Sequence, residues 1–275
     1  MPVDKFQALW LSHSSIGDYL KCPRLYFLKN IYKDPKTGHK VSLMTPPLAL
    51  GQVVHEVIES LSVLPSHDRF RSPLTIKFGE VWEKVTGERG GFKTPEIEKK
   101  FKKRGIAMIE RIMNNPDPLK KKAVKLKEEL PWFWLSEPDE IILCGKIDWL
   151  IYNESDDSVH ILDFKTGLSD ELESSLQLPI YALIAKNCQT RKTSGAAYWY
   201  LDRENAPKEV SLPDVTEAQE KLLAIGKKIK LARTLKRLEC KQNGCKWCIP
   251  MERVYRGEGK FVGLSNYNQD IYIEK

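Results

Sequence analysis

No run of apolar residues in this 275-residue chain approaches the roughly 18 that suggest a membrane-spanning helix. The first ten residues, MPVDKFQALW, contain no basic segment leading into an apolar run, so we expect no secretory signal. The G-x-x-x-x-G-K-[ST] phosphate-binding loop is also missing, which argues against ATP hydrolysis by this chain. These absences predict a cytoplasmic protein with no membrane partner.

Cysteine and net charge are both modest. The six Cys are not expected to form a disulfide framework in a reducing cytoplasm. The 44 Lys and Arg outnumber the 37 Asp and Glu to give a net charge of +7, which is compatible with a polyanionic partner. With 41% hydrophobic residues and no internal repeat, the chain can bury one large core, so we expect a single domain over residues 1–275.

Basic residues concentrate in two stretches. Between Lys99 and Lys127 the chain has eleven Lys or Arg and two acids, and between Lys227 and Lys241 it has seven against one acid. Such stretches are either solvated helix faces or surfaces that contact a phosphate backbone, and the pattern leaves both interpretations open.

Hydrophobic periodicity predicts an α/β chain. Residues 16–28 have helical spacing divided by Pro23, and the Pro-containing stretch 34–47 is typical of a loop. A turn signal at Asn153–Asp157 indicates a hairpin. We expect further helices over residues 48–64, 75–86, 95–113, 173–186 and 215–239, and strands over residues 124–135, 141–152, 159–166, 196–202 and 208–212.

Two acids and a lysine interrupt the apolar strands of this hairpin. Asp148 lies in ILCGKIDWLIY and Asp163 in ILDFKTG, where a carboxylate is costly to bury unless a cation or a donor satisfies it. Neighbouring strands can bring two carboxylates together, and their repulsion then calls for a divalent metal ion. Lys165 follows Asp163 by two residues, on the same strand face, where it can orient or deprotonate a water or stabilise charge on a phosphate. The alternative is a surface ion pair.

Five segments follow one another along the chain: SSIGDYLKCPRLYFLKNIY, LALGQVVHEVIESL, GKIDWL, ILDFKTG and QLPIYALIA. They resemble, in order, the Ser…Cys-Pro-Arg segment, the Gly-x-x-x-His helix, the acidic second motif, the D-x-K strand and the Gln-x-x-x-Tyr helix of one nuclease group. That group is the RecB-type branch of the PD-(D/E)XK nuclease superfamily, which includes the CRISPR-adaptation iron–sulfur exonucleases. The resemblance covers most of residues 12–201, which is a more specific signal than any one motif.

The resemblance implies a restriction-endonuclease-like core, with a mixed central sheet flanked by helices. Within it, residues 48–213 would form the catalytic core, and residues 1–47 plus 214–275 the helical portion with the cysteines. The implied ligands of Mg2+ or Mn2+ are His55, Asp148, Asp163 and the backbone carbonyl of Phe164.

The resemblance also implies roles for three further side chains. Lys165 would position the attacking water. Gln177 and Tyr181, one helical turn apart, would support the site or contact DNA. The competing interpretations are a hydrogen-bonded core histidine at His55 and a simple core residue at Tyr181. Zinc-enzyme alternatives fail on residue type, because HEVIE lacks the second His of H-E-x-x-H and CKWC lacks the Pro that precedes the cysteines of zinc deaminases.

Four of the six cysteines are candidate metal ligands by their resemblance to the family. In the resembled family an early Cys before Pro-Arg and three late Cys hold a 4Fe-4S cluster that joins the two ends of the chain. The family places its fourth ligand after the late C-x2-C pair, where this chain has Val254. The alternatives are a structural Zn2+ site, since four thiolates suit either centre, and thiols that bind no metal. The candidate ligands are Cys22, Cys240, Cys245 and Cys248.

The function implied by the resemblance is metal-dependent hydrolysis of DNA phosphodiesters. An exonuclease acting on single strands or free ends is favoured, in replication, recombination, repair or CRISPR adaptation, with a helicase or a recombination or CRISPR protein as partner. The alternatives are a structure-specific or nicking endonuclease and a non-catalytic DNA-binding subunit. Trp132, Trp134 and Trp199 are either core residues or stacking platforms for unpaired bases.

Overall fold

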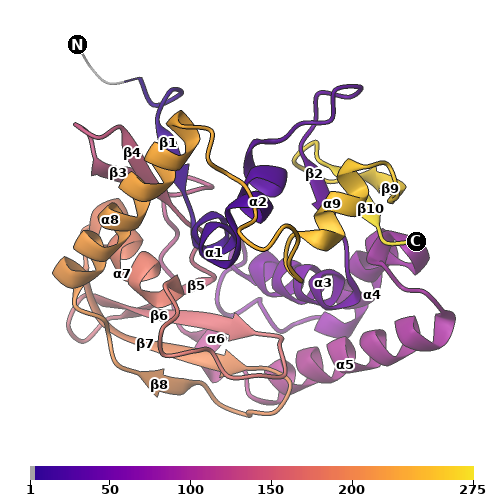
Figure 1. The fold of residues 1–275 in the computed structure, drawn as a ribbon. Coiled ribbons are helices and arrows are strands. Elements are labelled where there is room, and N and C mark those ends of the chain that lie inside the picture. Colours follow the sequence, from indigo (N-terminus) through magenta and orange to yellow (C-terminus); the bar gives the residue numbers. More distant parts are fainter. Residues whose placement is uncertain (1–3) are drawn as a thin grey trace.

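The predicted hairpin forms one side of the largest sheet. In the computed structural model, which describes residues 4–275, β5 (Trp149–Asn153) pairs antiparallel with β6 (Ser158–Lys165). β6 runs parallel to β7 (Lys192–Tyr200), which pairs antiparallel with β8 (Lys208–Val210). This four-stranded sheet is therefore mixed, and it lies at the bottom of the view in Figure 1.

Alternation along β6 separates two hydrophobic cores. Val159 and Ile161 belong to the core that also contains residues of α7 and α8, whereas Leu162 and Phe164 belong to the core with residues of α3, α4 and α5. Helices therefore cover both faces of the sheet (Figure 1). The helical segments are α1 (His13–Lys21), α2 (Pro23–Tyr26), the π-helical η1 (Phe27–Ile31), α3 (Pro46–Leu61), α4 (Leu74–Trp82), η2 (Glu83–Val85), η3 (Gly87–Gly90), α5 (Pro95–Asn114), α6 (Asp117–Lys120), α7 (Gln177–Cys188), α8 (Val215–Thr234) and α9 (Ile249–Tyr255).

The division at Pro23 is confirmed, and it positions α1. Ser12 caps this helix, because its Oγ accepts the N–H of Ser15 at 3.2 Å while Ser15 Oγ accepts the N–H of Ser12 at 2.9 Å. The helix ends at Lys21, and Pro23 begins α2. As a result, His13 and Cys22 lie at opposite ends of one short helix.

The single strand predicted over residues 141–152 is wrong. β4 (Ile141–Cys144) is followed by Gly145, where a Cβ would lie 3.4 Å from Ile180 Cγ2 of α7, and the chain turns past α7 before β5 begins. β4 instead pairs parallel with β1 (Leu9–Leu11) and antiparallel with β3 (Trp132–Ser136). The expected mixed central sheet is thus accompanied by a second mixed sheet.

A third sheet joins distant parts of the chain. β10 (Asp270–Ile273) pairs parallel with β2 (Val41–Leu43), inside the stretch predicted as a loop, and antiparallel with β9 (Lys260–Leu264). A small core beside it combines residues of the early and late segments: Cys22, Leu25, Leu28, Val41, Cys248, Met251 and Val254.

Other predicted boundaries shift. The strand predicted over 124–135 is regular only from Trp132, and the helix predicted over 215–239 ends at Thr234, two residues before Lys236 takes a left-handed φ of 55°. Among residues 4–275, none of the helices has both the length and the hydrophobicity needed to cross a bilayer. The proposed division of the domain into two portions stays a prediction, and residues 1–3 of the first portion lie outside the described residues.

Candidate active site and cysteine centre

The two acids lie at the open end of the β5–β6 hairpin. In the pairing of these strands, Trp149 lies opposite Leu162. Asp148 and Asp163 are each the next residue beyond that pair, so they too lie opposite each other. Asp148 Oδ2 accepts the backbone N–H of Phe164 at 3.0 Å, which holds the end of β5 against β6. Hairpin register therefore brings together the two carboxylates, as the sequence predicts.

His55 approaches this pair from α3. Its Nδ1 lies 3.3 Å from Asp148 Oδ1, and 37% of its side chain is exposed, so it is not a core histidine. Burial opposes the charged ring, but the charges of Asp148 and Asp163 outweigh burial and raise the pKa of His55 above 6.5. Burial likewise opposes the charge of Asp148, yet His55 and the Phe164 N–H lower its pKa below 3.8. His55 and Asp148 therefore stabilise each other in their charged forms.

Asp163 is the most deeply buried member of the group, with 1% of its surface exposed. Its Oδ1 accepts a hydrogen bond from Gln177 Nε2 at 2.8 Å, and the same amide donates to Tyr181 Oη at 3.0 Å. Burial, reinforced by the charge of Asp148, raises the pKa of Asp163 to about 7. The one-turn spacing of Gln177 and Tyr181 on α7 thus builds a hydrogen-bonded support for this carboxylate.

Lys165 lies where three acceptors converge. Its Nζ is 2.9 Å from Asp163 Oδ2 and 2.9 Å from Glu171 Oε2, and it donates to Gln177 Oε1. The ammonium also lies 4.8 Å from the ring centroid of Tyr198. Burial would lower the pKa of Lys165, but the two carboxylates outweigh burial and raise it. Lys165 is therefore a protonated, fixed hydrogen-bond donor at neutral pH.

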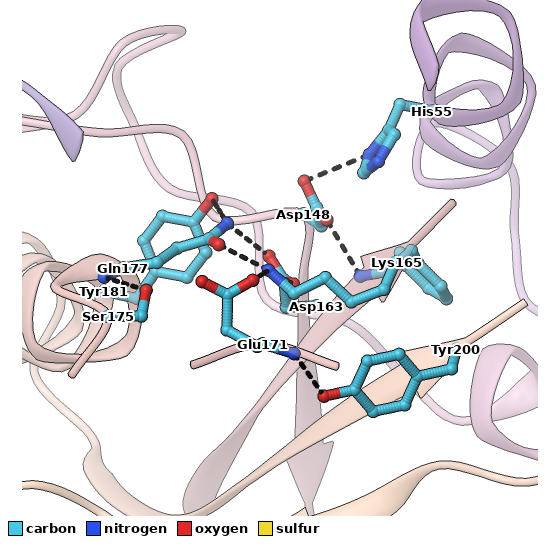
Figure 2. A network of polar contacts seen from close by, with 10 residues as sticks. His55, Asp148, Asp163, Lys165, Glu171, Ser175, Gln177, Tyr181 and Tyr200 are labelled. Carbon is cyan, nitrogen blue, oxygen red and sulfur yellow. Dashed lines mark hydrogen bonds and ion pairs between the residues drawn. The ribbon is translucent and has the colours of Figure 1, made fainter. Parts of the chain in front are cut away.

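Glu171 belongs to this network and was not predicted from the sequence. It lies in the irregular segment between β6 and α7, where its backbone N–H donates to Tyr200 Oη at 3.1 Å (Figure 2). Burial opposes its charge, but hydrogen bonds from Ser175 and Lys165 lower the pKa of Glu171 below 4.5. Glu171 follows the D-x-K motif in the sequence. The helix predicted to begin at Glu173, however, gave no reason to expect that the segment before it folds over Lys165.

The predicted ligands are donors of the kinds that divalent metal ions bind. Asp163 Oδ2 is buried and receives no oriented hydrogen bond, although Lys165 Nζ lies 2.9 Å from it. The N–H and C=O of one strand residue point to the same side, so the carbonyl of Phe164 is directed toward Asp148, as its N–H is. Two carboxylates, one carbonyl and one imidazole suit Mg2+ or Mn2+. His55 also lines a cavity of about 800 Å3 between α3 and the β9–β10 turn, and Asp148 lines an adjoining one.

The four predicted cysteines meet at one point. Their sulfur atoms all lie within 4.8 Å of one another. Hydrogen bonds from the backbone N–H groups of Gln242 and Gly244 lower the pKa of Cys240 to about 7, while burial raises the pKa of Cys248 to about 12. Cys144 and Cys188 lie outside this group, as expected. The early and late parts of the chain are thus brought together by a group of sulfurs that can bind metal.

The aromatic and basic predictions have mixed outcomes. The interpretation of Trp199 as a stacking platform is wrong, because Trp199 is fully buried between the sheet and the helices. Trp132 and Trp134 are partly buried.

Several charges in the basic stretches stabilise the fold, for example in the ion pairs Arg104–Asp202 and Lys230–Glu140. Solvated helix faces with local ion pairs therefore account for part of both stretches.

Comparison with known proteins agrees with the geometry. A search of curated proteins gave no match. The sequence model of the PD-(D/E)XK nuclease superfamily matches residues 10–251, a span that includes all five motifs and ends within α9. Given that match and the convergence of Asp148, Asp163 and Lys165 at one hairpin end, the chain belongs to the PD-(D/E)XK nuclease superfamily, a group of metal-dependent nucleases.

Proposed function

We propose that the protein is a DNA exonuclease that prefers single strands, of the RecB-type branch, acting in replication, recombination, repair or CRISPR adaptation. The observation that carries the proposal is the placement of Asp148 and Asp163 beside each other with Lys165 fixed next to Asp163. All three residues are assembled, which disfavours a non-catalytic binding subunit.

The residues of the chain divide the chemistry between them. Asp148, Asp163, the Phe164 carbonyl and His55 would hold Mg2+ or Mn2+. When bound, such a cation neutralises phosphate charge and lowers the pKa of water. The raised pKa of Lys165 favours its charged form, in which it would orient the attacking water or stabilise the negative charge that develops on the phosphate.

The shape of the site supports a flexible substrate. The side chain of Asp163 is 2% exposed and that of Lys165 13% exposed, so the scissile phosphate must enter a recess. A single strand bends into a recess at low cost, whereas a duplex is stiff over about 150 base pairs. An endonuclease on single strands would use the same recess, and circular substrates distinguish the two activities.

We further propose that the four cysteines hold a structural metal centre. The resemblance favours a 4Fe-4S cluster. The sulfur spacing supports a single tetrahedral ion as the second candidate, because Zn–S bonds of about 2.3 Å place thiolates about 3.8 Å apart, and Cys245 Sγ and Cys248 Sγ are 3.6 Å apart. A cubane binds each thiolate to a different iron and would require wider separations.

The deciding experiment is cleavage of labelled linear and circular single-stranded DNA with Mg2+, Mn2+ or a chelator. Asp163→Ala and Lys165→Ala should each lower kcat by about a thousand-fold or more with DNA binding retained, since each removes a group that contacts the reacting atoms. The matched control is Asp170→Ala, which removes an exposed acid from the segment that follows β6. Full activity in either variant would contradict the site, and cleaved circles would identify an endonuclease.

A further inference from the structure

Trp247 is the only Trp of residues 4–275 whose side chain is clearly exposed, at 43%. It lies inside the CKWC segment, between two cysteines of the metal-binding group. Backbone hydrogen bonds from Cys248 and Ile249 to the carbonyl of Cys245, at 3.1 and 3.0 Å, fix the turn. The turn directs the sulfurs inward and leaves the indole on the surface, so nothing in the packing of the core accounts for a Trp at this position.

Two ammonium groups lie beside the indole. Lys246 Nζ is 4.8 Å and Lys21 Nζ 5.0 Å from the centroid of the Trp247 ring. Among the described residues, neither lysine has a carboxylate within 4.0 Å, whereas Lys227 and Lys230 on α8 are both paired with acids. Trp247 therefore forms an aromatic surface with two uncompensated positive charges.

We infer that Trp247, Lys21 and Lys246 form a binding subsite for single-stranded nucleic acid, in which one unpaired base stacks on the indole and neighbouring phosphates pair with the two ammonium groups. Stacking of a base on an aromatic ring is stronger than a cation–π contact at an exposed site. An arriving base can therefore displace a lysine from the ring, and the released ammonium is free to bind phosphate. An acidic peptide would use the charges but not the ring.

The subsite lies on a route from the proposed active site, and this part of the inference rests on the proposed function. Burial lowers the pKa of His13 at the start of α1, and the charges of Glu171 and Lys165 also act on it, while Lys21 ends the same helix. The rise from His13 to Lys21 is about 12 Å, which matches about four stacked nucleotides at 3.4 Å each. A Cβ built on Gly17, midway along, would meet no atom within 4 Å, so the helix surface there is open.

The test measures binding of fluorescein-labelled dT20 by anisotropy, in an Asp163→Ala background that cannot cleave. Trp247→Ala should raise Kd about ten-fold, whereas Trp247→Phe, which keeps a stacking surface, should change it less than three-fold. Phe6→Ala is the matched control, because Phe6 is an exposed aromatic with Lys5 Nζ 5.4 Å from its ring centroid. Lys21→Gln combined with Lys246→Gln should reduce the salt dependence of log K by about 1.4, the value for two contacts with a single strand.

Each outcome decides the inference. Unchanged binding by Trp247→Ala at full metal content, or an equal loss with Phe6→Ala, would overturn it. If Trp247→Ala loses its metal, the double variant Lys21→Gln, Lys246→Gln provides the test instead. An unchanged salt dependence of log K in that variant would overturn the inference. If Trp247→Ala weakens binding but the wild-type protein cleaves no DNA, the subsite is supported and the proposed nuclease function is refuted. If the wild-type protein cleaves DNA and Trp247→Ala binds it normally, the nuclease function is supported and the subsite is refuted.

Discussion

Replacing Asp163 with Asn should remove a pH-dependent loss of stability from the metal-free protein. Asp163 is 1% exposed, and its pKa is raised from 3.8 to about 7. Between these two values the unfolded chain carries the ionised acid and the folded chain the neutral one. The unfolded state therefore binds fewer protons, and the free energy of unfolding falls as pH rises from about 4 to about 7.

The magnitude follows from the size of the shift. Each pKa unit corresponds to about 1.4 kcal/mol, so the full shift of about three units amounts to about 4 kcal/mol by pH 8. About 2 to 3 kcal/mol of this loss should fall between pH 5 and pH 8. Asn keeps the acceptor for Gln177 Nε2 but carries no charge to desolvate. The raised pKa of His55 also makes the free energy of unfolding fall as pH rises. The test therefore compares the pH dependence of this free energy between wild type and Asp163→Asn.

The assay is urea unfolding at pH 5, 6, 7 and 8 in buffers passed over a chelating resin, which removes free divalent ions. The free energy of unfolding of wild type should fall more steeply with pH than that of Asp163→Asn, by about 2 kcal/mol over the range. Adding Mn2+ at pH 8 should stabilise wild type and leave the variant unchanged, because the ion binds the ionised acid. If the free energy of unfolding depends on pH equally in the two proteins, the argument that Asp163 is desolvated beside Asp148 is refuted.

Two further predictions concern Glu171 and the cysteines. Glu171→Gln should lower kcat about ten-fold with KM nearly unchanged, because Lys165 loses a charged partner 2.9 Å away and is held less firmly; equal effects of Glu173→Gln, an exposed acid in the same segment, would contradict this role. Cys248→Ala should release the bound metal and lower Tm, since Cys248 is fully buried among residues from both ends of the chain. Metal analysis and the visible absorption of the wild-type protein distinguish iron–sulfur from zinc, and an unchanged metal content in Cys248→Ala would contradict its role as a ligand.

Local patterns predicted the parts of the site that lie within one element or one hairpin. The period of two places Asp163 and Lys165 on the same face of β6, and their ion pair confirms it. The helical period places Gln177 and Tyr181 one turn apart, and their hydrogen bond confirms that as well. The turn at Asn153–Asp157 joins the two strands at whose open ends the acids lie. In each case the direction of a side chain depends only on the local backbone.

Boundaries were predicted less well where packing overrides local preference. The apolar run from Ile141 to Tyr152 favours one strand, but the chain passes α7 at Gly145 and changes sheets there. The stretch 34–47 has the Pro and Gly content of a loop, yet β2 forms in it by pairing with β10, more than 200 residues away. Hydrophobic periodicity describes only residues close together in the sequence, so it cannot predict strand pairing with such a distant segment.

By itself the sequence determined the hairpin with its acids, the D-x-K strand, the Gln-x-x-x-Tyr helix and the four cysteines suited to a metal centre. The resemblance already implied that His55 joins the two acids, and the structure places His55 Nδ1 3.3 Å from Asp148 Oδ1. Only the tertiary structure decided that Glu171 reaches Lys165, that Trp199 is buried and that Trp247 is exposed. The physical reason is that backbone geometry within an element sets where a side chain points, whereas its neighbours depend on how separate elements pack.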